Sequence, residues 1–189
     1  MCTALVHRTL FGRTLDLEYS YREQVVVVPR RFPLSFHMVQ APAPHHAIIG
    51  MAHVEHGYPL FYDGVNETGL AMAALNFPLS AIYHPPKEGM DNIAPFEFIP
   101  WILGQCSTAA QARRLLERAN PVKLDFGPDL PSTPLHWIIA DREQAITVEP
   151  MADGLHIHKA QRRCPQGERP QQAAGHPKML ACFFHSHAS

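Results

Sequence analysis

The sequence predicts an α+β fold in which helices pack on an antiparallel sheet. Three observations lead to this prediction. Strand signals dominate residues 1–83, helical spacing dominates residues 94–120, and strand signals return over residues 135–158. An order of strands, helices and strands is typical of a layered domain whose sheet is covered by helices. With 189 residues, the chain is long enough for one domain with a hydrophobic core.

The first stretch is predicted to form strands and one hairpin. Residues 25–28 are a run of valines that ends at Pro29, which is typical of a β-strand. The sequence Asn-Glu-Thr-Gly at residues 66–69 has turn chemistry, and Gly69 suits a position that needs a positive φ. The other strands expected here are residues 47–54, 60–63 and 70–77, the last two flanking that turn.

The middle stretch is predicted to form two helices. Pro95 suits the first turn of one helix, and Pro100 is expected to interrupt or kink it. Thr108 can cap a second helix, because Gln111 completes a Thr-x-x-Gln capping box. The apolar positions at helical spacing are Ala112, Leu115, Leu116 and Ala119, and Asn120 with Pro121 should end the helix.

Strands return before the character of the chain changes. Residues 135–140 and 145–149 are expected strands joined by a polar turn, and the Asp153-Gly154 turn precedes a third strand at residues 155–158. From about residue 160 onward Gln, Arg, Pro and Gly dominate without helical or strand periodicity. We therefore expect residues 1–158 to form the domain and residues 159–189 to be a divergent, disordered or frameshifted tail.

The composition excludes several classes of function. The net charge of −1, with both signs spread along the chain, gives no footprint for nucleic acid or an anionic membrane. No apolar run is long enough to span a bilayer, and the N-terminus does not have the pattern of a secretory signal. The four cysteines are widely spaced and form no CxxC motif, which favours a reducing, cytoplasmic setting over a disulfide framework.

Cys2 is the cysteine whose place in the sequence has chemical meaning. It follows Met1 directly, and removal of Met1 would leave a thiol and a free α-amine on one residue. An α-amine has a pKa of about 7.7–8.0 and can act as a general base, while a free thiol has a pKa of about 8.5. One residue could then supply both nucleophile and base. The alternative is that position 2 happens to be a cysteine.

Two other groups of residues invite a functional interpretation. The chain has 13 histidines, including His53-x-x-His56, but none has HExxH spacing and none pairs with a CxxC motif. Scattered surface histidines are therefore favoured over a metal-binding protein. Cys106 could be mistaken for the nucleophile of a thiol protease, but no positioned histidine and asparagine can be assigned to it. A buried structural cysteine is the better interpretation.

Several blocks of the sequence, in order from residue 1 to about residue 158, resemble the choloylglycine hydrolase family, which includes bile salt hydrolases and penicillin V acylases. The blocks are MCTAL at residues 1–5, FGRTLDLE at residues 11–18, GVNETGLAMAALNFP at residues 64–78, LHWIIAD at residues 135–141, TVE at residues 147–149 and DGL at residues 153–155. The resemblance implies a layered αββα sandwich of the N-terminal-nucleophile (Ntn) hydrolase type, no cofactor and no metal, and a tendency to form homo-oligomers. It also implies cleavage of linear amide bonds in small molecules, such as those of conjugated bile salts.

The resemblance assigns roles to four residues. Cys2 would attack the amide carbonyl and form a thioester that water hydrolyses. Arg13 matches an arginine beside the nucleophile, and Asp16 matches a carboxylate that orients the α-amine. Asn76 matches an asparagine of the oxyanion hole, and an Asn rather than a Tyr at this place is typical of the bile-salt-type members. Without the resemblance, Arg13 and Asp16 could be ordinary surface charges and Asn76 a strand-end residue.

The sequence also departs from the family. Thr9 leads directly into Leu10 with no turn residue, so the N-terminal hairpin is shorter than is usual in the family. The resemblance ends near residue 158, so the expected Ntn fold is incomplete, without its C-terminal half. A shifted reading frame over residues 160–166 would be compatible with the family's next strand. The alternatives to a bile salt hydrolase are therefore an inactive truncated fragment or a penicillin V acylase-type member.

Overall fold

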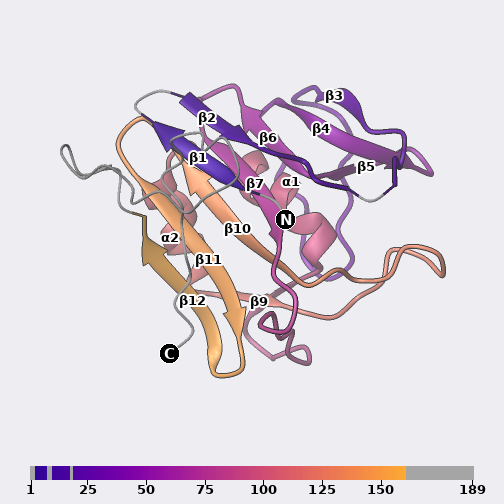
Figure 1. Ribbon diagram of the computed structural model, residues 1–189, viewed down its shortest axis with the longest axis vertical. Helices are drawn as coiled ribbons and strands as arrows, with labels where there is room; N and C mark the ends of the chain where they lie inside the picture. Colours follow the sequence, from indigo (N-terminus) through magenta and orange to yellow (C-terminus); the bar gives the residue numbers. More distant parts are fainter. Residues whose placement is uncertain (1–2, 8–9, 18, 161–189) are drawn as a thin grey trace, which may run out of the picture.

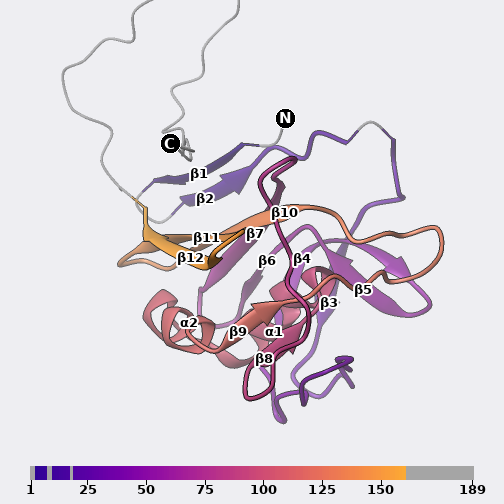
Figure 2. The same cartoon turned by 90° about the horizontal axis from the view of Figure 1, so that it is seen from below.

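The computed structural model describes residues 3–7, 10–17 and 19–160, and it shows three layers. An eight-stranded antiparallel sheet forms the middle layer, with helices on one face and a two-stranded hairpin over part of the other (Figures 1 and 2). The α+β prediction is confirmed. The large sheet contains β3 (Gln24–Val28), β4 (Ile48–Glu55), β5 (Tyr58–Phe61), β6 (Asp63–Asn66), β7 (Ala71–Asn76), β10 (Leu135–Ala140), β11 (Ala145–Met151) and β12 (Gly154–Lys159).

The strand order of the large sheet is β12-β11-β10-β7-β6-β4-β3, and β5 pairs with β4 as well. The hairpin consists of β1 (Ala4–His7) and β2 (Leu10–Arg13). A short parallel pair, β8 (Asp91–Ile93) and β9 (Ala119–Pro121), lies beside the helices. The helical segments are a 3₁₀ turn (Pro95–Glu97), α1 (Phe98–Gln105) and α2 (Ala109–Leu116).

The strands predicted near both ends of the sheet are confirmed, and one hairpin needs a correction. The turn at residues 66–69 joins two antiparallel strands, and Gly69 has a φ of 89° as expected. However, the first strand of that hairpin is β6, not residues 60–63. A strand break after Phe61 separates β5 from β6, although both pair with β4. Sequence alone could not show this break, because it depends on the register with β4.

Two predictions about the helices were wrong in detail. Pro100 does not interrupt a helix, because it lies in the first turn of α1, where a backbone N–H has no partner within the helix. The second helix ends at Leu116, before Ala119, because Ala119–Pro121 pairs with β8. Its predicted cap is correct: the Thr108 hydroxyl accepts a hydrogen bond from the Gln111 N–H at 3.2 Å. The Gln111 side chain in turn accepts from the Ser107 N–H at 2.7 Å.

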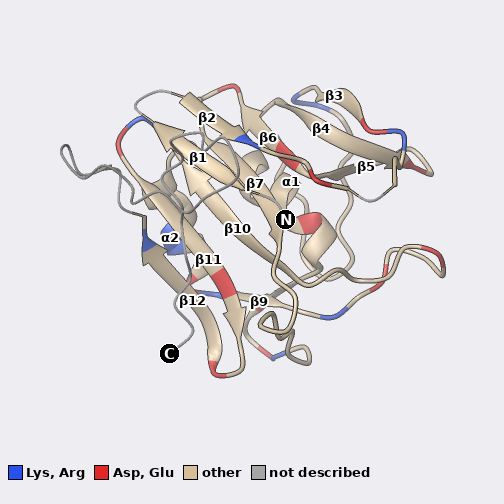
Figure 3. Cartoon of the chain, in the orientation of Figure 1, with Lys and Arg blue, Asp and Glu red and all other residues tan. Residues whose placement is uncertain are grey.

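The main core lies between the sheet and the helices. Helix α1 is buried along almost its whole length, and its Phe98 ring lies 4.2 Å from the ring of Trp137 on β10. Helix α2 buries only the face that carries Ala109, Ala112 and Leu116. No helix of the described residues is long and apolar enough to cross a membrane. Charged residues of both signs are spread over loops and strand ends, and one acidic position lies within β11 (Figure 3).

A second, smaller core lies between the hairpin and the opposite face of the sheet. It consists of small and aliphatic side chains from β1, β7, β10 and β11. The hairpin covers only this part of the face. Where the same face continues over β3, β4 and β6, its aliphatic side chains are exposed. The buried set is Ala4, Val6, Ala73, Leu75, Ile138, Ala140, Ala145 and Ala160, and the exposed set is Val25, Val27, Ile49 and Val65.

Candidate active site at the open end of the hairpin

The N-terminal hairpin fixes the residue that follows Cys2. Cys2 itself lies outside the described residues. The backbone N–H of Thr3 donates to the Thr14 hydroxyl at 3.0 Å, and the Thr14 N–H donates to the Thr3 carbonyl at 2.8 Å. Both backbone groups of Thr3 are therefore held against the residue after Arg13.

Arg13 ends β2, and its side chain points under the hairpin toward the large sheet. The side chain is only 6% exposed. Its Nε donates to the Thr14 carbonyl at 3.1 Å, and Nη1 donates to the Tyr62 carbonyl at 3.4 Å and lies 3.7 Å from the Asp63 carboxylate. A buried guanidinium needs such partners, because burial of an unpaired charge is costly. Arg13 is therefore not an ordinary surface charge.

A β-bulge supplies these partners for Arg13. Ala52 of β4 pairs with Phe61 of β5, and Ile49 of β4 pairs with Val65 of β6. Between these two pairs, two residues of β4 lie opposite three residues of the neighbouring chain segment. The extra residue falls at Tyr62 and Asp63, where the strand bends. The close approach of the backbones requires glycine at position 50, because a Cβ there would lie 2.1 Å from the Asp63 carbonyl oxygen. The Asp63 carboxylate also accepts from the Met51 N–H at 3.2 Å.

Asp16 is connected to the same cluster through Thr14. The Thr14 hydroxyl donates to the Asp16 carboxylate at 3.2 Å while it accepts from the Thr3 N–H. The exposed Asp16 and the buried Arg13 therefore lie on either side of Thr14, close to the start of β1. An acidic group and a cationic group beside one chain terminus can orient an amine and favour a thiolate.

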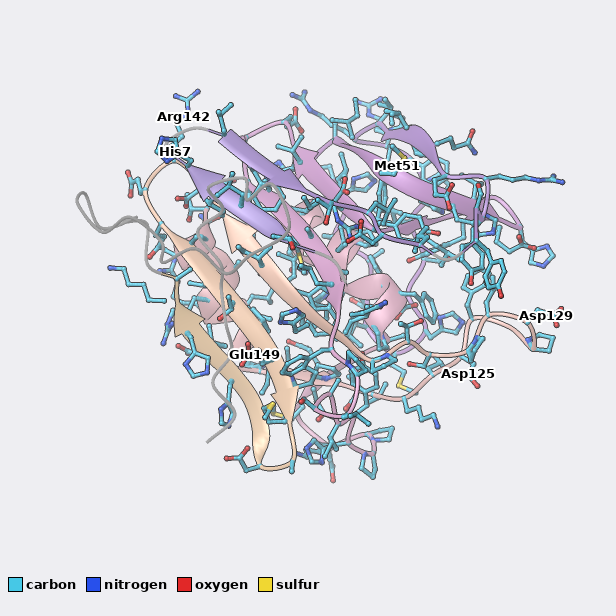
Figure 4. The ribbon with its side chains drawn as sticks, viewed as in Figure 1. His7, Met51, Asp125, Asp129, Arg142 and Glu149 are labelled. Carbon is cyan, nitrogen blue, oxygen red and sulfur yellow. The ribbon has the colours of Figure 1, made fainter. Side chains whose placement is uncertain are left out.

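Asn76 lies at the same end of the sheet as the open end of the hairpin. His7, at the closed end of the hairpin, and Arg142, in the turn after β10, lie at one end of the molecule (Figure 4). The antiparallel register places Asn76 opposite Leu135, the first residue of β10 and hence at its other end. Asn76 is exposed at the last position of β7. The Phe77 N–H then donates to the Pro134 carbonyl at 2.8 Å, which closes the end of this ladder.

Comparisons with known proteins decide the family. The sequence model of linear amide C–N hydrolases, choloylglycine hydrolase family, matches residues 2–167. The chain belongs to the choloylglycine hydrolase family. The match continues past residue 158, where the resemblance was predicted to end.

The relatives of this choloylglycine hydrolase family member include bile salt enzymes. It is 42% identical over 161 residues to a bile salt hydrolase/transferase of Lactiplantibacillus plantarum, a match that covers 84% of this chain and 50% of that protein. It is 34% identical to the corresponding enzyme of Clostridium perfringens, with coverage of 83% and 50%. The chain thus spans about half the length of the curated relatives it matches.

Solved structures show the same fold. A cysteine-to-alanine mutant of conjugated bile acid hydrolase from Clostridium perfringens matches with a TM-score of 0.78 and 33% identity, covering 85% of this chain and 51% of that one. Penicillin V acylase from Agrobacterium tumefaciens matches with a TM-score of 0.59 and 18% identity, which supports the fold alone. The predicted Ntn-hydrolase fold, spanned in part, is therefore confirmed.

A groove of about 760 Å³ separates the hairpin from the uncovered part of the sheet in this family member. Aliphatic residues of β2, β3, β4 and β6 line it. Arg13 and Asp63 also belong to its lining, as do Asp141 and Arg142 of the turn after β10. The groove is thus an apolar surface with charged groups among its walls.

The sequence did not reveal Thr14, Tyr62, Asp63 or Gly50 as parts of the site. Thr14 lies within a block that resembles the family, between Arg13 and Asp16, and this position was the available signal. The contribution of Tyr62 is a backbone carbonyl, which no side-chain pattern can indicate. Gly50 could have been identified only from the register of β4, because its role is to allow a close backbone approach.

The other candidates of the sequence analysis lie elsewhere. No group of three or more metal-ligating side chains occurs among the residues that the structure describes. The prediction of surface histidines is wrong for His45, which is buried, because its ring contacts the His46 and Phe32 carbonyl oxygens at 2.7 and 2.8 Å. Cys106 is 3% exposed, and burial raises the pKa of its thiol to about 11. The prediction that Cys106 is a buried structural cysteine is confirmed, since a thiol with a raised pKa is a poor nucleophile near neutral pH.

Proposed function

We propose that this protein hydrolyses linear amide C–N bonds, with conjugated bile salts as its substrates and Cys2 as its nucleophile. The family match and the bile salt relatives support the reaction class. The observation that carries the site is the buried Arg13, held by the Tyr62–Asp63 bulge beside the residue that follows Cys2.

The proposed mechanism begins with removal of Met1. The α-amine of Cys2 then accepts the thiol proton, and the thiolate attacks the substrate carbonyl carbon. The Asn76 side chain donates to the oxyanion of the tetrahedral intermediate. Collapse of that intermediate transfers the proton to the leaving nitrogen and releases the amine, such as glycine or taurine. Water then hydrolyses the thioester, with the α-amine of Cys2 again acting as the base, and this step regenerates the thiol.

Arg13 and Asp16 have separate roles in this proposal. The Arg13 guanidinium favours the thiolate of Cys2 and can attract an anionic group of the substrate. Asp16, bridged to Thr3 through the Thr14 hydroxyl, orients the α-amine. A single arginine that is fixed by three oxygen atoms keeps its position with little loss of conformational freedom when substrate binds.

Two further properties belong to the proposal. Homo-oligomers, to which the family tends, and a cytoplasmic location are both expected for this protein. An Asn at position 76 favours a bile-salt-type specificity over a penicillin V acylase-type one. An inactive fragment remains the alternative to test, because the relatives are about twice as long as the matched part.

The test is an assay of the purified full-length chain on glycocholate, taurocholate and penicillin V. We expect the release of glycine or taurine from the bile salts to be faster than the hydrolysis of the penicillin V side-chain amide. We also expect mass spectrometry after an acid quench to detect a cholyl thioester on Cys2. Cys2→Ser should reduce the rate severely, whereas Cys106→Ser should leave it nearly unchanged. Retention of Met1, or equal loss in both variants, would refute the mechanism. No turnover of any substrate by well-folded protein would support the inactive alternative.

A further inference from the structure

A polar pair ends the apolar stripe beneath the hairpin. On β10, Ile138 and Ala140 belong to the small core, and His136 follows on the same face. The register of Trp137 opposite Val148 places His136 opposite Glu149 on β11. The side chains are only 18% and 11% exposed, and Nδ1 of His136 lies 3.7 Å from a Glu149 carboxylate oxygen. Figure 4 shows Glu149 on β11, well away from the hairpin's closed end.

The His136 ring also holds the chain just after Asn76. It stacks on the Phe77 ring with a centroid separation of 4.6 Å and an interplanar angle of 15°. Phe77 is bonded through its N–H to the Pro134 carbonyl, two residues before His136. The end of β7 is therefore held by the backbone hydrogen bond to Pro134 and by the stacking of the Phe77 and His136 rings.

Glu149 lies beside the His136 ring, whose buried Nδ1 faces the carboxylate and has no hydrogen-bond partner among the described residues. The carboxylate also lies 3.9 Å from Nε2 of His158 on β12, and it pairs across the strands with His156, whose ring contacts Asp153 at 2.9 Å. Burial lowers the pKa of His136 although the nearby carboxylate raises it, so the imidazole is neutral near pH 7. A neutral ring that is packed between Phe77 and Glu149 can keep one orientation without an added buried charge.

We infer that His136 and Glu149 are positioning residues for the amidase reaction, because they fix the end of β7 that presents Asn76. This inference rests on the proposed function, in which Asn76 is an oxyanion donor. Neither residue needs to touch the substrate. An oxyanion donor works only when its N–H points at the developing charge, so a small displacement of the strand end lowers the rate without weakening substrate binding.

The test is a double-mutant cycle on glycocholate hydrolysis by the full-length protein. We expect Glu149→Gln and His136→Ala to lower kcat about ten- to a hundred-fold with little change in KM. In an Asn76→Ala background, the same substitutions should cause no further loss, because the donor they position is gone. Two matched controls should leave kcat unchanged: Glu143→Gln, at an exposed glutamate in the turn before β11, and His56→Ala, at an exposed histidine after β4. The inference would be overturned if Glu149→Gln or His136→Ala lowered kcat by the same factor in the Asn76→Ala background as in the wild-type protein. A change in KM alone would also overturn it.

A second measurement separates this inference from the proposed function. Amide hydrogen exchange at Phe77 reports the backbone bond to Pro134 whether or not the protein turns over substrate. Exchange at Phe77 should accelerate in both variants, while exchange at Ala73, in the middle of β7, stays slow. If the wild-type chain has no amidase activity, the proposed function fails, and the exchange result decides whether this pair holds the strand end. Unchanged exchange at Phe77 in both variants would overturn the inference.

Discussion

One face of the large sheet has two parts that differ in how they are stabilised. Over β7, β10 and β11 the hairpin covers the face, and Ile138 and Ala73 are buried there. Over β3, β4 and β6 the face is open, and Val27 and Ile49 remain 62% and 44% exposed. Both parts carry the same alternation of aliphatic residues. Alternation therefore marks an apolar face, whereas the element that covers this face determines how much it contributes to stability.

The bulge within the open part, where β6 also pairs with β7 of the covered part, is the site most sensitive to substitution. Gly50→Ala should lower the free energy of unfolding by about 3 kcal/mol, because backbone atoms must move away from the new Cβ. The same movement displaces Tyr62 and Asp63, so Arg13 would lose its acceptors and any amidase activity should fall as well. Chemical denaturation and the glycocholate assay measure the two effects.

Gly12→Ala is the matched control for that substitution. Gly12 lies on β2, and a Cβ there would meet no atom within 4 Å. Its effect on the free energy of unfolding should stay within about 1 kcal/mol, since a glycine within a strand is already unfavourable. Equal destabilisation by the two substitutions would show that the close approach of Gly50 to Asp63 is not the cause.

A pair of identical substitutions compares the covered and open parts directly. Ile138→Ala removes a side chain that is 2% exposed, and we expect a loss of about 3 kcal/mol. Ile49→Ala removes the same atoms from the open part, and about 1 kcal/mol should be lost there. Urea denaturation midpoints with unchanged slopes would measure both. Similar losses would mean that the open part is covered in solution.

Valine-to-threonine substitutions extend the comparison to a smaller change. Val6→Thr introduces a hydroxyl into the small core, where Val6 is 5% exposed, and should cost about 1–3 kcal/mol. Val27→Thr keeps the β-branched shape on the open part and should change stability by less than about 0.5 kcal/mol. Thermal unfolding of the two variants under one condition tests the difference. A large loss from Val27→Thr would contradict the exposure of β3.

Local signals explain what the sequence could predict. Strands β10, β11 and β12 were predicted closely because their alternation and their turns, such as Asp153-Gly154, are encoded within a few residues. The cap of α2 is likewise local. The bulge at Tyr62 and the burial of Arg13 were not predictable, because both depend on contacts between segments that lie far apart in the chain. The roles of Cys2, Arg13, Asp16 and Asn76 came from the family resemblance, and they remain predictions until the assays are made.

The smallest expected effect concerns the ion pair that holds the edge of the open part. Arg30, just after β3, contacts Glu67 in the turn between β6 and β7, and Glu67 also accepts from the Ala47 N–H at 2.9 Å. Two hydrogen bonds lower the pKa of Glu67 to about 2, and the one from the Arg30 side chain has a larger effect than the one from the Ala47 N–H. A carboxyl whose pKa is lower in the folded protein contributes its stability above its unfolded pKa and loses it as the pH falls toward 2. We therefore expect protection against hydrogen exchange, taken relative to the intrinsic exchange rate at each pH, to fall in β3 between about pH 4.5 and pH 2 more than it falls in β10. Glu67→Gln should remove most of that pH dependence, and added salt should weaken it in the wild-type protein, because this pair is exposed to solvent. An equal loss of protection in β3 of the Glu67→Gln variant would show that another group governs the edge of the open part.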